Sequence, residues 1–214
     1  LRGQVQSVRV ADLDALPPFT GGAVGYAGYD AVRYVEHLPD APEEDRLLPD
    51  LYFGLFDHMA VFDHVRKLVY VLVLADVGGK DEAGIREAYD AACQRVDHYV
   101  ARLDDASETL SLADIDVDGD VRLDYQSNFT QDEFEAAVRK CVEYVEAGDI
   151  FQVVISQRLA VDLQAHPLEL YRTLRVVNPS PFMFYLRMPD ATLVGSSPEI
   201  MVRVVAGLTT VRPL

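Results

Sequence analysis

Residues 81–103 carry the clearest helical pattern in the chain. Apolar side chains recur in this segment every three or four positions, so they line one face of a helix. They are Ile85, Tyr89, Ala92, Val96, Val100 and Leu103. We therefore predict a helix over 81–103 with one apolar face.

A second helix is predicted from the residues at its two ends. Thr130 and Glu133 have the spacing of a capping box, in which each satisfies a backbone N–H of the other. Phe129 and Phe134 stand at the positions of a hydrophobic staple. Gly148 suits the left-handed residue that commonly ends a helix, so we predict a helix between Thr130 and Gly148.

The last part of the sequence predicts one short helix followed by short strands. Pro167 suits the first turn of a helix over 168–177, which must end before Asn178-Pro179. Short strands are then expected at 182–188, 191–194, 200–205 and 208–212. Turns at Pro189-Asp190 and Ala206-Gly207 separate them.

Four other segments are predicted to be extended. A glycine-rich run over 19–29 indicates a buried strand, followed by a short helix near 30–35. The runs 51–62 and 65–74 are rich in β-branched and aromatic residues, which predicts an antiparallel hairpin with His64 in its turn. Apolar and polar residues alternate over 151–163, which predicts a long strand. Its polar face would carry Gln152, Ser156 and Arg158.

This order of elements predicts an α+β fold with mixed or antiparallel sheets and packed helices. A doubly wound fold is not expected, because strand–helix units do not repeat regularly along the chain. The acidic, irregular segment 104–128 separates two groups of elements, and its composition indicates either a crossing loop or an interdomain linker. If it is a linker, it separates two domains, over 1–127 and 128–214.

Composition restricts the class of partner. The chain of 214 residues has 19 Lys and Arg against 35 Asp and Glu, a net charge of −16, which disfavours binding to nucleic acid. No apolar run approaches the roughly 18 residues that a membrane-spanning helix needs. Two cysteines without a metal-binding spacing favour a reducing compartment, and we expect a cytoplasmic protein.

Several candidate site residues can be interpreted in either structural or functional terms. The glycines at 22, 25 and 28 lack a phosphate-loop spacing, so a structural role is favoured. A structural role is likewise favoured over metal binding for His58 and His64. The polar face over Gln152, Ser156 and Arg158 suits either carboxylate binding or an ordinary covered sheet face. The rigid segment 178–183 suits either a ligand-binding wall or core packing.

Five motifs together resemble component I of anthranilate synthase, among the chorismate-utilising enzymes. They follow the order of that family across nearly the whole chain, and their combination is far more specific than any one of them. They are PFTGGAVGY at 18–26, VFDH at 61–64, GDIFQVVISQR at 148–158, NPSPFMFY at 178–185 and GSSPEI at 195–200.

The resemblance implies a magnesium-dependent lyase. Such an enzyme converts chorismate and ammonia into anthranilate and pyruvate, with the ammonia delivered from glutamine by an amidotransferase subunit. Residues 1–127 would then be a regulatory domain, incomplete at its start, and 128–214 the first part of the chorismate-binding domain. The catalytic residues and Mg²⁺ ligands are expected beyond Leu214, so no catalytic or metal residue is assigned within this chain, and the 214 residues alone are expected to be inactive.

The resemblance also implies feedback inhibition by tryptophan. The part of the inhibitor pocket that falls in this chain is Pro181, Phe182 and Met183, and its other half is expected before Leu1. Many relatives have Tyr in place of Phe182, so a hydroxyl contact is expected to be missing here. Glu199 lies in a family motif, but the resemblance gives no role for it.

Two alternatives remain beside this reading. The first is aminodeoxychorismate synthase component I, which would be indicated by Lys in place of Ala directly after Leu214. The motif around Met183 favours the anthranilate enzyme. The second is a noncatalytic regulatory fragment that binds tryptophan, which submicromolar binding of tryptophan by this chain alone would support.

Overall fold

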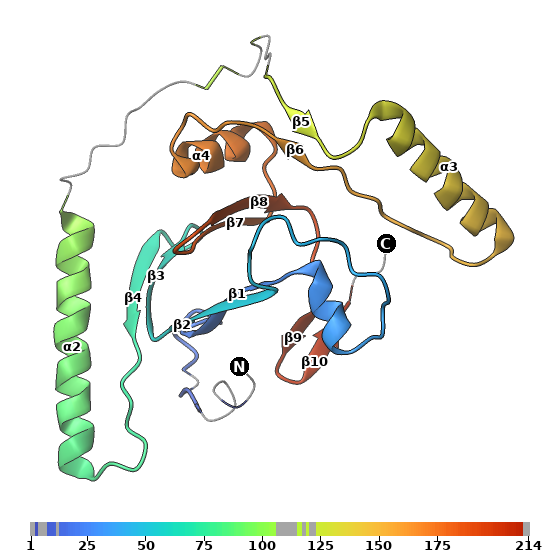
Figure 1. The fold of residues 1–214 in the computed structure, drawn as a ribbon. Coiled ribbons are helices and arrows are strands. Elements are labelled where there is room, and N and C mark those ends of the chain that lie inside the picture. The colour runs from blue at the N-terminus through green and yellow to red at the C-terminus, as the bar shows by residue number, and fades with distance from the viewer. Residues whose placement is uncertain are drawn as a thin grey trace. The chain divides into compact units, whose positions relative to one another are not determined.

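The structure, a computed structural model, describes residues 3, 8–11, 13–105, 115–116, 119 and 123–211. Its contacts divide the chain into two compact units, Leu1–Ser111 and Leu112–Leu214. Figure 1 traces both units along the chain. The domain boundary expected near residue 127 stays a prediction, and most of the acidic segment 104–128 lies outside the described residues.

Two strands that are distant in the sequence form the first sheet of the N-terminal unit. β1 (Gly22–Ala27) pairs antiparallel with β2 (Leu51–Phe56). The backbones approach so closely that a Cβ added to Gly25 would collide with the carbonyl oxygen of Tyr52. The favoured structural role of the glycines is therefore supported at Gly25. The 3-10 helix η1 (Tyr29–Tyr34) follows β1 and confirms the short helix expected there.

The predicted hairpin is present, but its first strand is shorter than expected. β3 (His58–Asp63) pairs with β4 (Leu68–Val73), and His64 lies in the turn between them, as predicted. The prediction of one continuous strand over 51–62 is wrong, because a bend at Asp57 interrupts the strand. The physical reason is that β2 and β3 hydrogen-bond to different partners, so the backbone must bend between them.

The long helix of the N-terminal unit is α2 (Glu82–Asp104), which confirms the prediction over 81–103. Asp81 caps it, since its Oδ1 accepts a hydrogen bond of 2.9 Å from the backbone N–H of Gly84. The helix packs on β4, as Figure 1 shows. Helix α2 thus covers the β3–β4 hairpin.

Helix α3 (Gln131–Ala147) in the C-terminal unit begins and ends as predicted. Thr130 Oγ1 accepts from the backbone N–H of Glu133, and the Glu133 carboxylate accepts from the backbone N–H of Thr130 at 2.9 Å. The rings of Phe129 and Phe134 lie edge to face, 5.7 Å apart. Gly148 has the left-handed backbone that ends the helix, with a φ of 81°.

The prediction of a long strand over 151–163 is wrong. Only β6 (Leu159–Ala160) is formed there, paired antiparallel with β5 (Gln126–Ser127). A strand needs a hydrogen-bonded neighbour, and among the described residues the segment 151–157 has no backbone hydrogen bond to another segment, whereas the Arg158 carbonyl oxygen accepts from the backbone N–H of Asn128 at 3.1 Å. No common strand face for Gln152, Ser156 and Arg158 therefore exists in this structure.

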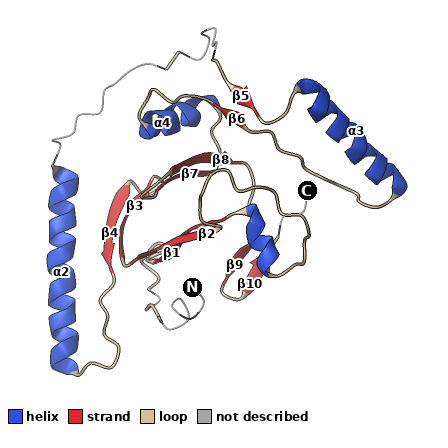
Figure 2. Ribbon diagram, viewed as in Figure 1, coloured by secondary structure: helices blue, strands red, loops and turns tan. Residues whose placement is uncertain are grey.

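A helix and two hairpins complete the C-terminal unit. Figure 2 shows the strands of this unit in pairs and α4 beside the pair β7–β8. The first hairpin turns at Pro189-Asp190 and the second at Ala206-Gly207, as predicted. Arg212, the expected last strand residue, lies outside the described residues. The elements are α4 (Pro167–Val177), β7 (Phe182–Arg187), β8 (Thr192–Ser197), β9 (Arg203–Val205) and β10 (Leu208–Thr210).

The five strand pairs within the described ranges are all antiparallel and two-stranded, and helices pack on two of them, which confirms the α+β class. Among the described residues, only Met188 is buried, with 8% of its surface exposed. None of the helices in the described ranges is long and apolar enough to cross a bilayer.

Candidate functional site

The predicted ligand-binding residues follow the end of α4 in a turn tied to strand β8. Asn178 caps α4 with a non-helical backbone (φ −142°, ψ 67°), since the proline after it disfavours helix. Its carbonyl oxygen accepts a hydrogen bond of 2.6 Å from Ser196 Oγ. The backbone N–H of Phe182 donates to Ser180 Oγ at 3.2 Å. Hydrogen bonds therefore hold the turn at both ends, and Pro181 immediately precedes β7.

Phe182 and Met183 are neighbours on one strand, so their side chains point to opposite faces of the hairpin. Phe182 lies opposite Ser197 and is 42% exposed, whereas Met183 lies opposite Ser196 and is half-buried. The Met183 face is the one that α4 covers, through an edge-to-face contact of Tyr171 with Tyr185. A ligand that touches both side chains must therefore bind around the start of β7, beside Pro181.

Gly195 makes room for an aromatic ring on the other face. It lies opposite Phe184, and a Cβ built on it would be 2.5 Å from Phe184 Cε1. The far end of the Phe184 ring thus occupies the space that a Cβ on Gly195 would fill. This packing explains why a glycine opens the motif at 195–200, and it leaves the Phe182 face carrying two partly exposed aromatic rings.

Glu199 contributes its backbone to the same region. Its carbonyl oxygen accepts a hydrogen bond of 3.0 Å from Ser197 Oγ, which holds the chain just after β8. Its side chain is half-buried. We assign it no chemical role.

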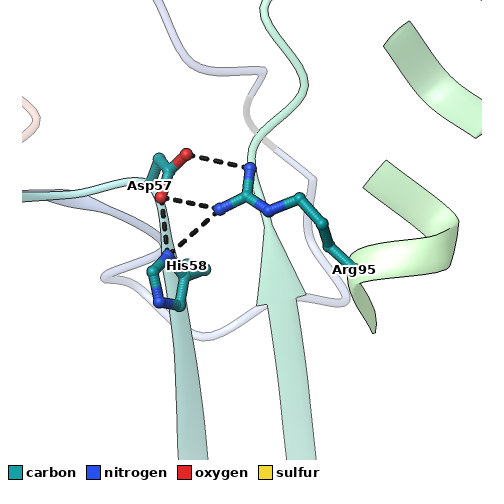
Figure 3. Close-up of polar contacts among 3 residues, drawn as sticks. All are labelled: Asp57, His58 and Arg95. Carbon is teal, nitrogen blue, oxygen red and sulfur yellow. Dashed lines mark hydrogen bonds and ion pairs between the residues drawn. The ribbon is translucent and has the colours of Figure 1, made fainter. Parts of the chain in front are cut away.

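A second polar cluster, formed by Asp57, His58, Arg95 and Tyr99, lies in the N-terminal unit. The Arg95 guanidinium donates two hydrogen bonds, each of 3.0 Å, to the two carboxylate oxygens of Asp57. This fork, drawn in Figure 3, ties helix α2 to the bend between β2 and β3. The His58 ring stacks on Tyr99 with centroids 4.6 Å apart.

The tautomer of His58 follows from its partners. Nδ1 lies 2.6 Å from Asp57 Oδ1 and 3.2 Å from a guanidinium nitrogen of Arg95. An ionised carboxylate only accepts and a guanidinium only donates, so Nδ1 cannot satisfy both with one proton. We assign the proton to Nδ1, donating to Asp57 over the shorter distance. The hydrogen bonds from Arg95, and after them the one from His58, hold the pKa of the Asp57 carboxyl far below its ordinary range.

Replacing Arg95 with Gln is expected to lower the urea midpoint of unfolding by about 0.2–0.5 M above pH 5, because the exposed Asp57 pair is worth little in water. A lowered pKa stabilises the fold only where Asp57 is ionised. The contribution is thus complete above about pH 4 and is lost as the pH falls further. Urea titrations at pH 6 and pH 3 measure it.

The matched control is Arg86→Gln, which removes the same charge from an exposed position of α2. It is expected to shift the midpoint less and without this dependence on pH. An Arg95→Gln effect that is equally large at pH 3 would show that the guanidinium stabilises α2 in some other way than by binding the Asp57 carboxylate.

The described residues do not offer a magnesium site. No three His, Cys, Asp or Glu side chains gather as metal ligands in the described part of the chain. We therefore derive no chemical step through a metal here. The predicted residues Pro181, Phe182 and Met183 are brought together at one turn, whereas Gln152, Ser156 and Arg158 do not form the expected face.

Sequence reasoning missed the cluster around Asp57. One signal for it was available, because Arg95 and Tyr99 are four residues apart and so share a face of the predicted helix. The spacing of Arg95 and Tyr99 does not indicate that their partners lie at the bend between β2 and β3, which is distant in the sequence. His166 was missed as well: its Nδ1 accepts from the backbone N–H of Leu168 at 3.1 Å and caps α4.

Comparison with known proteins gives consistent matches over the whole chain. A family model described as chorismate binding enzyme matches residues 2–214. Anthranilate synthase component 1 of Acetivibrio thermocellus is 38% identical over 225 residues, covering 100% of this chain and 43% of that protein. The chloroplastic anthranilate synthase alpha subunit 1 of Arabidopsis thaliana is 45% identical over 205 residues, covering 92% of this chain and 34% of that protein.

The match extends to solved structures. The crystal structure of anthranilate synthase component I from Streptococcus pneumoniae TIGR4 superposes with a TM-score of 0.77 at 26% identity. It covers 97% of this chain and 45% of that one. The component 1 of Pseudomonas putida is 40% identical, covering 96% of this chain and 41% of that protein. The chain thus spans less than half the length of these relatives.

Proposed function

This chain belongs to the family of chorismate binding enzymes, and we propose from that membership that it forms part of an anthranilate synthase component I. The observation that carries the proposal is the 38–45% identity to anthranilate synthases, which extends over more than nine-tenths of the chain. The reaction is the conversion of chorismate and ammonia into anthranilate and pyruvate, a carbon–oxygen lyase reaction that leads to tryptophan.

The proposal includes the partners of that reaction. Ammonia reaches the enzyme from glutamine through an amidotransferase subunit, and Mg²⁺ assists at the chorismate carboxylates, bound by residues other than those described here. A divalent cation together with a few Arg side chains would offset locally the repulsion between a chain with a net charge of −16 and a dianionic substrate. Cytoplasm is the proposed compartment.

Tryptophan is the proposed inhibitor, bound at the start of β7 by Pro181, Phe182 and Met183. Two features of the turn support this. Its hydrogen bonds to Ser180 and Ser196 hold the backbone rigid, which lowers the entropic cost of binding. The partly exposed Phe182 ring offers an apolar face to an indole, the kind of aromatic contact that stabilises a complex beyond its buried area.

The chain of 214 residues alone is expected to form no anthranilate from chorismate, ammonium and Mg²⁺. The same residues, exchanged for the matching segment of the Pseudomonas putida relative, are expected to form anthranilate and pyruvate in equal amounts. Anthranilate is followed by its fluorescence and pyruvate by coupled oxidation of NADH.

Two outcomes contradict the proposal. Anthranilate formation by the 214 residues alone would show that they hold the catalytic groups. An exchanged protein that consumes chorismate and releases no pyruvate would be an aminodeoxychorismate synthase instead. The Pseudomonas putida protein without the exchange is the positive control.

A further inference from the structure

A cavity of about 560 Å³ lies between the start of α4 and the turn that joins β7 to β8. Its volume falls within the range of about 300–1,000 Å³ typical of small-molecule sites. The apolar part of its lining includes Leu163, Pro167, Leu170 and Val194, and the charged part is Arg187 and Asp190. The cavity thus combines an apolar wall with one cationic and one anionic side chain.

The turn that carries both charges is well fixed. The backbone N–H of Met188 donates to the carbonyl oxygen of Ala191 at 2.8 Å, which closes the hairpin. The Met188 side chain is 8% exposed. Arg187, the last residue of β7, and Asp190 in the turn are therefore held on a rigid support beside the cavity.

The two charges are available to a ligand. Among the residues that the structure describes, neither Arg187 nor Asp190 forms an ion pair or side-chain hydrogen bond, and they do not pair with each other. Opposite charges that line one cavity without neutralising each other suit a ligand that itself carries both signs.

We propose that this cavity binds an α-amino acid with an apolar side chain. The Arg187 guanidinium binds the ligand carboxylate through two parallel N–H donors, and the Asp190 carboxylate accepts from the ligand ammonium group. The side chain of the ligand packs against Leu163, Leu170 and Val194. Arg187 is at the opposite end of β7 from Phe182, about 17 Å away along the strand, so this site is separate from the proposed tryptophan site and goes beyond the proposed function.

The test is a calorimetric titration of the intact chain with L-leucine. We expect saturable binding with a dissociation constant at or below about 1 mM. The same titration with 4-methylpentanoate, which lacks the ammonium group, and with 3-methylbutylamine, which lacks the carboxylate, is expected to give binding at least tenfold weaker in each case. Amide resonances of Met188 to Thr192 should shift with L-leucine in ¹⁵N spectra.

Two variants locate the binding. Arg187→Gln and Asp190→Asn are each expected to weaken L-leucine binding at least tenfold. Arg203→Gln, which removes the same charge from exposed strand β9, and Phe182→Ala are expected to leave it unchanged. Both cavity variants alter exposed side chains, and unchanged urea midpoints would show that they fold.

Three results would overturn the proposal. They are the absence of L-leucine binding up to about 1 mM, equal binding of either half-ligand, and binding that the two cavity variants leave intact. The comparison of L-leucine with the two half-ligands decides the question on the unaltered chain even if a variant fails to fold. Anthranilate formation plays no part in these measurements, so the proposed function can fail separately.

Discussion

Replacing Gly25 with alanine is expected to lower the free energy of unfolding of the chain by at least about 2 kcal/mol. An alanine in place of a strand glycine ordinarily stabilises, by roughly 0.5–1 kcal/mol, because it restricts the unfolded chain. At Gly25 the sign reverses. The added Cβ would collide with the Tyr52 carbonyl oxygen and lie 2.7 Å from the Cα of Phe53. Both are backbone atoms of the paired strand, so neither can rotate away.

Urea unfolding followed by circular dichroism measures this effect. The matched control is Gly78→Ala, whose added Cβ meets only the Asp76 side chain, at 3.3 Å. That side chain can move, so we expect a change within about 0.5 kcal/mol. Equal stabilities of the Gly25 and Gly78 variants would mean that β1 and β2 are further apart in solution than described.

Replacing Phe182 with alanine is expected to weaken tryptophan inhibition at least tenfold. The proposal places the ring against the indole, and such an aromatic contact contributes about 0.5–1.5 kcal/mol beyond its buried area. Together with the lost apolar surface this amounts to a factor of ten or more. The measurement is the inhibition constant for tryptophan in the exchanged protein that forms anthranilate.

The matched control for this variant is Phe184→Ala. Phe184 is on the same strand and the same face, is 46% exposed against 42% for Phe182, and lies two residues further from Pro181. We expect it to change the inhibition constant less than threefold, with the KM for chorismate unaltered in both variants. If both substitutions weaken inhibition equally, the ring of Phe182 has no special place in the pocket.

Contacts between residues close in the sequence were predictable, whereas contacts between distant residues were not. The ends of α3 were predicted residue by residue, because Thr130 and Glu133 satisfy each other within one turn. The prediction of a strand over 151–163 was wrong, because alternation of apolar and polar side chains does not show which segment would pair with that strand.

The candidate sites divide in the same way. Pro181, Phe182 and Met183 are contiguous, so their proximity was certain, but the alternation of faces was a consequence of β7 that the motif did not reveal. The ion pair of Asp57 with Arg95 joins residues from different elements. Nothing local to Asp57 indicates that β2 ends there, because the bend results from the choice of pairing partners on either side.

The strand pairs also differ in the length of chain that each must close, and this orders the events of folding. β3–β4, β7–β8 and β9–β10 are joined by tight turns, so they form on the microsecond scale of hairpins. β1–β2 and β5–β6 must close the longer segments 28–50 and 128–158, which costs more chain entropy. We therefore infer that the local hairpins form before the β1–β2 pairing around Gly25.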